Sequence, residues 1–258
     1  MAEAKDTTVT VCDCRVAVRR GGAGPPLLYL HGARGLPGWL PFLGKLADRF
    51  EVFAPDHPGY GRSDNPGWLE EIPDFAYFYL EFLKVQKLER AHVVGHSLGG
   101  WIAAEMAIRS TQRMATLTLI SAAGLRLKGK GSPDMFAMDR PQIIRTFFHD
   151  PATIEHQLAN PPAPEEETQV ARNLVTAARV AWQPRFHNPK LRKWLRRIDV
   201  PTHIIWGDDD KVVVPDYGPE FQKEIPGSKM TILADAGHML HMEKPDVLAD
   251  AVTDFLRG

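Results

Sequence analysis

Gly95, Ser97 and Gly99 form the pattern G-x-S-x-G in the middle of the chain. The apolar run 91–94 before them is typical of a buried strand, and the mostly apolar residues 101–107 after them are typical of a helix. A strand that turns at once into a helix exposes one side chain at its tip and needs small neighbours to pack so tightly. The pattern therefore predicts Ser97 at the tip, with a helix N-terminus directed at whatever Ser97 attacks.

A serine hydroxyl is a weak nucleophile near neutral pH, so it needs a base to accept its proton and an acid to orient that base. In parallel-sheet proteins such groups collect at the carboxyl ends of strands. Three acids, residues 208–210, follow the apolar run 202–206, and His238 follows the run 230–233 beside Gly237. This order of serine, acid and histidine predicts acyl-transfer chemistry, and the spacing alone leaves all three acids as candidates.

Short apolar runs alternate with segments of helical periodicity over most of the chain. The alternation favours an α/β fold with a mostly parallel central sheet and helices on both faces. The predicted strands are residues 27–30, 50–54, 91–94, 115–120, 202–206 and 230–233, with one or two edge strands within 7–19. The predicted helices are residues 39–46, 73–85, the segment after Ser97, 217–224 and 245–256.

The interval from Ala122 to Asp199 interrupts this alternation and is too long for a simple crossover connection. It contains several aromatic residues and methionines of its own, and the acidic run 165–167 is typical of a helix start. We therefore predict residues 122–199 as an inserted helical cap, and residues 1–121 and 200–258 as the core beneath it. The apolar residues of the interval also favour an enclosed apolar pocket.

The composition argues against several classes of partner. With 258 residues, 44% of them hydrophobic, the chain has material for one large domain with a substantial core. Its formal net charge of −1 does not suggest binding to nucleic acid or to an anionic membrane. Residues 1–6 are polar and no apolar run is long enough to cross a bilayer, which favours a cytoplasmic protein without a signal peptide.

The cysteines and histidines give no indication of a metal or a redox centre. Cys12 and Cys14 are two residues apart, so we predict two free thiols on the same face of a strand. Neither H-E-x-x-H nor H-x-H occurs in the sequence. We expect no metal and no organic cofactor, and a small molecule as the partner.

Taken together, these motifs resemble the α/β-hydrolase family over nearly the whole chain outside the predicted cap. The resemblance singles out Asp210 among the three acids and His238 over His241. It rests on five segments: the nucleophile elbow at 95–99, W-G-x-x-D at 206–210, G-H with the following Glu243 and Pro245 at 237–245, D-x-P-G-x-G-x-S at 56–63, and H-G at 31–32.

The resemblance implies a catalytic triad of Ser97, Asp210 and His238. It also implies an oxyanion hole formed by the backbone N–H groups of Ala33 and Leu98. Because family members that open epoxides or remove halide carry aspartate at the elbow, serine implies acyl transfer. The expected substrates are carboxylic esters, thioesters or lactones of small to medium apolar molecules.

Two alternatives stay open. A carbon–carbon bond hydrolase of ring-cleavage products uses the same triad, and residues 33–38 match in part the glycine-rich segment of that type. A ligand-binding protein that has lost its chemistry would keep the fold but would have no need of all three triad residues. Arg34, beside the oxyanion loop, is compatible with a substrate carboxylate or with a solvated loop position. The oligomeric state is left open.

Overall fold

The computed structural model describes residues 3–257. Met1, Ala2 and Gly258, which fall in the predicted polar N-terminus and core, lie outside the described residues. One eight-stranded sheet in the order β1-β2-β4-β3-β5-β6-β7-β8 organises the described chain. β3 to β8 are parallel, whereas β2 pairs antiparallel with both β1 and β4. The strands are β1 Ala4–Val11, β2 Cys14–Gly21, β3 Pro26–Leu30, β4 Glu51–Pro55, β5 Ala91–His96, β6 Met114–Ile120, β7 Thr202–Gly207 and β8 Lys229–Leu233.

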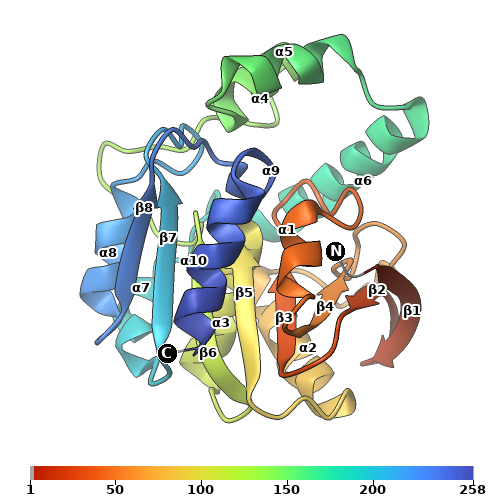
Figure 1. The fold of residues 1–258 in the computed structure, drawn as a ribbon, viewed down its shortest axis with the longest axis vertical. Coiled ribbons are helices and arrows are strands. Elements are labelled where there is room, and N and C mark those ends of the chain that lie inside the picture. Colours follow the sequence, from red (N-terminus) through yellow and green to blue (C-terminus); the bar gives the residue numbers. More distant parts are fainter. Residues whose placement is uncertain (1–2, 258) are drawn as a thin grey trace.

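Helices cover both faces of this sheet (Figure 1), which confirms the predicted α/β fold. α1 (Pro41–Leu46) and α10 (Pro245–Arg257) bury apolar side chains against one face. α2 (Ile72–Val85), α3 (Leu98–Arg109) and α8 (Tyr217–Glu224) do so against the other. Each predicted strand and helix of the core is present, because the apolar runs and helical spacing of the sequence match the faces that the sheet buries.

The β1–β2 hairpin corrects the expectation for the two cysteines. Cys12 and Asp13 form the turn of the hairpin, with φ angles of 48° and 58°, so Cys12 is not part of a strand. Cys12 is exposed and Cys14 is buried, and both are free thiols. The prediction that they share one face of a strand is wrong, because the chain reverses direction between them.

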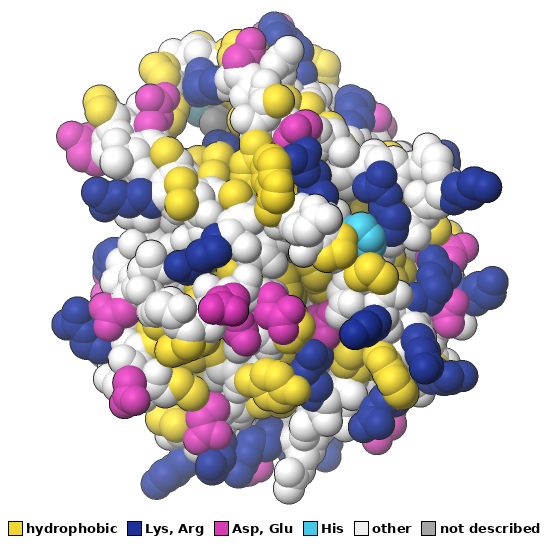
Figure 2. Space-filling view, turned by 180° about the vertical axis from the view of Figure 1, so that it is seen from behind, with side chains coloured by type: hydrophobic (Ala, Val, Ile, Leu, Met, Phe, Trp, Pro, Cys, Tyr) yellow, Lys and Arg dark blue, Asp and Glu magenta, His cyan; other side chains and the backbone are white. Residues whose placement is uncertain are grey.

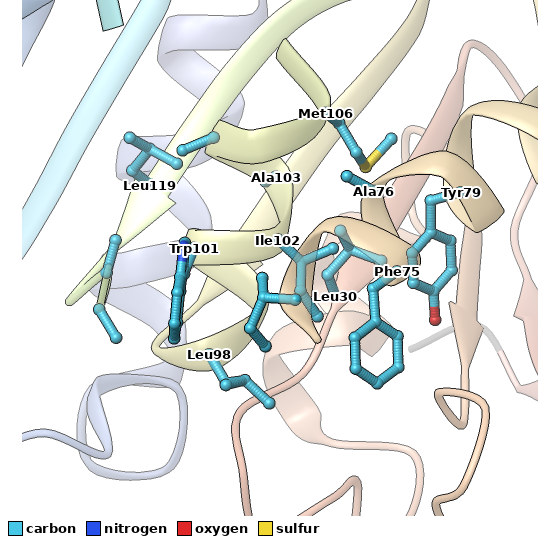
Figure 3. Packing of buried hydrophobic residues seen from close by; sticks show 14 of the residues in the cluster. Leu30, Phe75, Ala76, Tyr79, Leu98, Trp101, Ile102, Ala103, Met106 and Leu119 are labelled. Atoms are coloured by element: carbon cyan, nitrogen blue, oxygen red, sulfur yellow. The ribbon is translucent and has the colours of Figure 1, made fainter. Parts of the chain in front are cut away.

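α3 is buried on nearly all sides, which is typical of a helix in the centre of a protein. Figure 3 shows Ile102 and Met106 of α3 beside Phe75 and Ala76 of α2. The apolar packing around the helix holds its N-terminus, and therefore the residue that precedes it, in a defined place at the end of β5. Core packing of this density leaves little freedom for the turn between β5 and α3.

Between β6 and β7 the chain leaves the sheet, and we call residues 121–201 the β6–β7 insertion. Figure 1 shows α4 and α5 beyond the upper ends of the strands and α6 running back toward α1. α7 and the 3-10 helix η1 return to the body of the protein and pack near α3 and α8. The helices are α4 Arg140–Phe147, α5 Pro151–Ala159, α6 Pro164–Ala181, α7 Leu191–Trp194 and η1 Leu195–Arg197.

The surface carries charges of both signs. Figure 2 shows Lys and Arg side chains interspersed with Asp and Glu over the face seen from behind, in keeping with the formal net charge of −1. Across residues 3–257, none of the helices combines the length and the apolar character that crossing a membrane requires.

Candidate active site

Ser97 lies at the tip of the turn from β5 into α3. Its backbone has φ 55° and ψ −115°, a conformation that costs free energy for any residue other than glycine and is found at functional sites. The crossing of strand and helix is too close for side chains on either side. A Cβ atom added at Gly99 would lie 2.0 Å from the carbonyl oxygen of Leu30, and one at Gly95 would lie 2.3 Å from the carbonyl oxygen of Gly99.

The substitution Gly99→Ala is therefore expected to destabilise the protein by at least about 2 kcal/mol, because backbone atoms rather than a flexible side chain occupy the space. Urea unfolding followed by circular dichroism measures the change. Gly67→Ala is the matched control, since nothing lies within 4 Å of a Cβ atom there. Equal unfolding midpoints for the two variants would show that the elbow is not tightly packed.

The structure brings Ser97, His238 and Asp210 together in one hydrogen-bonded row. Ser97 Oγ lies 3.0 Å from Nε2 of His238, and Nδ1 of His238 lies 2.8 Å from Oδ2 of Asp210. All three side chains are almost fully enclosed, with Ser97 the most exposed at 9%. When Nδ1 of His238 carries the proton and donates a hydrogen bond to Asp210, Nε2 is unprotonated and can accept the proton of Ser97.

The three successive acids after β7 have three different contacts. Asp210 alone meets His238, and its second oxygen accepts the backbone N–H groups of Val212 and Val213, each at 2.9 Å. Asp209 instead pairs with His149 of the β6–β7 insertion and with Lys211. Asp208 accepts the backbone N–H of Ala236 at 3.3 Å. Only the Asp210 carboxylate is therefore placed to orient the imidazole.

The two predicted oxyanion donors lie on either side of Ser97. Leu98 is the first residue of α3, and Ala33 follows Gly32, whose Cβ position would be 3.3 Å from Cβ of Ser97. Within residues 3–257, neither the Ala33 nor the Leu98 N–H donates a hydrogen bond to another protein group. Both donors are thus available to an oxygen atom bound next to Ser97.

Four further histidines are buried around the site. His31 donates from Nδ1 to the carbonyl oxygen of Gly32 (2.8 Å) and accepts the backbone N–H of His57 at Nε2 (3.1 Å). His96 donates from Nε2 to the carbonyl oxygen of His238 (2.9 Å). The ring of His241 packs against that of His96 (4.5 Å between centroids), and none of its atoms bonds to Ser97. Through these bonds His31 and His96 tie together the loops that carry Gly32, His57 and His238.

Burial lowers the pKa of each of these four histidines, because the protein interior solvates a cation poorly. The pKa of His31 falls to about 4 and that of His241 to about 3. The pKa of His57 and that of His96 lie well below the ordinary value, in both cases mainly through burial. All four are therefore neutral near pH 7.

The β6–β7 insertion contacts the histidine loop through the segment after α4. The carbonyl oxygen of Phe147 accepts the N–H of Met239 at 3.1 Å. Glu243 accepts the N–H groups of His149 (2.6 Å) and Asp150 (3.1 Å) with one oxygen and that of Gly237 (2.8 Å) with the other. Glu243 therefore ties the insertion to the loop that carries His238, a role that its place in the sequence motif did not reveal.

One aromatic ring of the insertion reaches the site. The ring of Phe147 stands perpendicular to that of His238, with 5.4 Å between centroids. Phe136, Trp182 and Phe186 pack against one another instead. The sequence predicted an apolar pocket from the apolar residues of the insertion as a group, because periodicity does not say which ring faces inward.

A surface cavity of about 680 Å³ lies elsewhere, along α2 and the β1–β2 turn. Trp68, Tyr77 and Cys12 are among its lining residues, and no member of the Ser97–His238–Asp210 row lines it. This cavity is separate from the candidate active site.

The fold and the arrangement around the strained serine are those of the α/β-hydrolase class of proteins. The chain belongs to the alpha/beta hydrolase family, whose model matches residues 27–251. A relative with 30% identity over 241 residues is the dihydrolipoyllysine-residue acetyltransferase component of the acetoin cleaving system of Cupriavidus necator. That alignment covers 88% of this chain and 62% of the relative, so the chain spans less than two thirds of that protein.

Two further proteins are similar to this chain. The 2-hydroxy-6-oxo-6-phenylhexa-2,4-dienoate hydrolase of Comamonas testosteroni is 26% identical over 276 residues, which cover 98% of this chain and 95% of that protein. The crystal structure of a carboxylesterase from Bacillus subtilis superimposes with a TM-score of 0.76 at 21% identity, covering 98% of this chain and 92% of that one. This second likeness is one of fold.

Proposed function

We propose that this chain is a serine hydrolase that cleaves carboxylic esters of small to medium apolar molecules through an acyl-enzyme on Ser97. The observation that carries the proposal is the row from Ser97 Oγ to His238 Nε2 (3.0 Å) and from His238 Nδ1 to Asp210 (2.8 Å). Such a row gives a serine the base and the orienting acid that nucleophilic attack requires. The carboxylesterase of similar fold supports this choice of substrate class.

The mechanism follows from the geometry. Ser97 Oγ attacks the ester carbonyl carbon while Nε2 of His238 takes its proton, and Asp210 stabilises the resulting imidazolium. The oxyanion accepts hydrogen bonds from the N–H groups of Ala33 and Leu98, each worth about 3 to 4 kcal/mol in comparable enzymes. The leaving alcohol takes the proton from His238. A water molecule, deprotonated by His238, then releases the acid from Ser97 through the same steps.

The insertion is part of the proposal. Phe147, packed on the ring of His238, supplies an apolar wall beside the reacting atoms. Two sets of hydrogen bonds join the insertion to the core. Glu243 accepts the N–H groups of His149 and Asp150. Asn173 and Thr176 of α6 donate to carbonyl oxygens of core loops. We propose that residues 122–199 act as a cap that shields the acyl-enzyme from bulk water.

Carbon–carbon bond hydrolysis is the second candidate. It is favoured by the likeness to the Comamonas testosteroni dienoate hydrolase over nearly the full length of both chains. That reaction would use the same Ser97 and His238. The two candidates differ in whether simple esters are turned over.

The test is hydrolysis of p-nitrophenyl esters from acetate to palmitate, together with labelling by a fluorophosphonate. We expect turnover of the short and medium esters, and a label on Ser97. Ser121→Ala is the matched control, since Ser121 is also a buried serine at a strand end but its Oγ has no hydrogen-bond partner within residues 3–257. Labelling without ester turnover would favour the carbon–carbon hydrolase, and no labelling would favour a ligand-binding protein.

A further inference from the structure

Arg34 and His238 both contact the ring of Phe147. The guanidinium carbon of Arg34 is 5.9 Å from the centroid of the Phe147 ring, on the face of that ring. The same ring contacts the imidazole of His238 at 5.4 Å. Arg34 also directly follows Ala33, the proposed oxyanion donor. The guanidinium and the imidazole of His238 therefore contact the same ring, which belongs to the β6–β7 insertion.

Among the residues that the structure describes, the guanidinium of Arg34 has no partner of opposite charge. Within residues 3–257, its side chain makes no hydrogen bond and no ion pair, although it is half-buried. Each of the other arginines that is only partly exposed pairs with a carboxylate or with backbone carbonyl oxygens: Arg19, Arg109, Arg113, Arg140, Arg185 and Arg192. Arg34 is the exception among them, and it is the one at the candidate active site.

Partial burial of this cation costs free energy, and no ion pair or hydrogen bond within residues 3–257 offsets that cost. Burial lowers the pKa of the Arg34 guanidinium, because the surroundings solvate the charge less well than water. The ring of Phe147 at 5.9 Å offers only a weak cation–π contact. A partly buried charge that lacks a protein partner beside a candidate active site is a candidate for pairing with a ligand.

The backbone of Arg34 is held from both sides. Its carbonyl oxygen accepts a hydrogen bond from Nδ2 of Asn173 at 2.9 Å, and the N–H of Gly35 donates to the carbonyl oxygen of Gly32 at 3.0 Å. Asn173 is buried, with 3% of its surface exposed, and its Oδ1 accepts the N–H of Gly61. The insertion and the core thus fix the point from which the Arg34 side chain starts, which is what a specific binding residue requires.

We infer that Arg34 binds a carboxylate of the substrate, so that the preferred esters carry a free carboxylate a few bonds from the scissile carbonyl. A guanidinium presents two parallel N–H donors that match the two oxygens of a carboxylate. This inference rests on the proposed ester hydrolysis and names its substrate class. The substrate carboxylate would be the ion-pair partner that Arg34 does not have among residues 3–257.

The test compares paired esters that differ only in the carboxylate. Mono-p-nitrophenyl esters of glutaric, adipic and pimelic acid are set against p-nitrophenyl pentanoate, hexanoate and heptanoate, which places the carboxylate in the acyl part. Acetoxybenzoates set against phenyl acetate place it in the leaving part. The readout is the ratio of kcat/KM between the charged and the neutral ester of each pair, in which effects common to both cancel.

For the best pair, we expect the wild type to favour the charged ester by about 10- to 100-fold, the range typical of a charge-assisted hydrogen bond. Arg34→Met, which keeps the apolar stem, is expected to abolish this preference, and Arg34→Lys to keep part of it. Arg185→Met is the matched control, because Arg185 also stacks on an aromatic ring of the insertion, Trp182, but pairs with Asp134. It is expected to leave the ratio unchanged.

A second readout does not depend on ester cleavage. Glutarate and adipate are expected to slow labelling of Ser97 by a fluorophosphonate, and to raise the Tm, more than the neutral pentanamide and hexanamide do, in the wild type but not in Arg34→Met. If no ester is cleaved but this difference is found, ester hydrolysis fails and the carboxylate site stands. If no pair of either kind shows a preference that depends on Arg34, and the diacids protect no better than the neutral amides, the inference is overturned.

Discussion

Replacing His238 by alanine is expected to lower kcat for the best p-nitrophenyl ester by about 10⁶-fold, and Ser97→Ala by a similar factor. Each removes one end of the Ser97–His238 hydrogen bond, without which neither attack by the serine nor protonation of the leaving group takes place. Asp210→Asn is expected to cost about 10⁴-fold, because an amide favours the wrong tautomer of the imidazole. Steady-state kinetics on purified variants measures these losses.

The two larger losses are expected not to add. Because Ser97 and His238 act as a unit, the double variant is predicted to be no slower than either single variant. His156→Ala, an exposed histidine of α5, is the control and is expected to retain wild-type kcat. A larger loss for Asp209→Asn than for Asp210→Asn would contradict the assignment of the acid, since Asp209 contacts His149 and Lys211 instead.

Acidification from pH 7.5 to pH 4.5 is expected to remove several kcal/mol of unfolding free energy. Burial lowers the pKa of His31 to about 4 and that of His241 to about 3, and it lowers the pKa values of His57 and His96 well below their ordinary range. In the unfolded chain each histidine titrates near 6.5. Below pH 6.5 the unfolded state therefore binds more protons than the folded state.

The sign of the effect follows from this difference. The stabilising contribution of the neutral histidines is complete above pH 6.5 and is lost as the pH falls toward the folded pKa values. His31 alone accounts for about 3 kcal/mol by pH 4. Urea unfolding at intervals of half a pH unit measures the loss, whose slope below pH 6 approaches about 1.4 kcal/mol per pH unit for each histidine.

A single substitution isolates one member of this group. His241→Gln is expected to reduce the slope of unfolding free energy against pH by the contribution of one histidine. The substitution breaks no hydrogen bond at Nδ1, which has no partner within residues 3–257. His156→Gln, at an exposed position, is the control and is expected to leave the slope unchanged. An unfolding free energy that stays constant between pH 7 and pH 5 would contradict the prediction.

The elements of the core were predictable because each depends on local pattern. Apolar runs such as 202–206 became buried strands, and the helical spacing of 217–224 became α8 with the same bounds. The β1–β2 hairpin was harder, because nothing in the alternation of residues 7–19 indicates that Cys12 and Asp13 turn rather than extend. Positive φ at these two residues is a property of the hairpin as a whole.

Local sequence pattern is sufficient to predict Ser97 at the tip of the elbow. Ser97 is preceded by an apolar strand, followed by an apolar helix and flanked by glycines, and all of this lies within about a dozen residues. Such local spacing defines a strand–turn–helix whatever surrounds it, because the close crossing of strand and helix excludes side chains at Gly95 and Gly99.

Which groups lie together in the site became known only from the folded chain. His238 is 141 residues from Ser97 and 28 from Asp210 in the sequence. By spacing alone, each of the three adjacent acids was an equally good candidate for the residue that orients His238. The folded chain also shows that Phe147 rather than another aromatic ring lies on His238, and that Arg34 has no charged partner within residues 3–257. Such contacts depend on how the strand ends and the β6–β7 insertion pack in space. A contact between residues far apart in the chain leaves no signal in the local sequence around either residue.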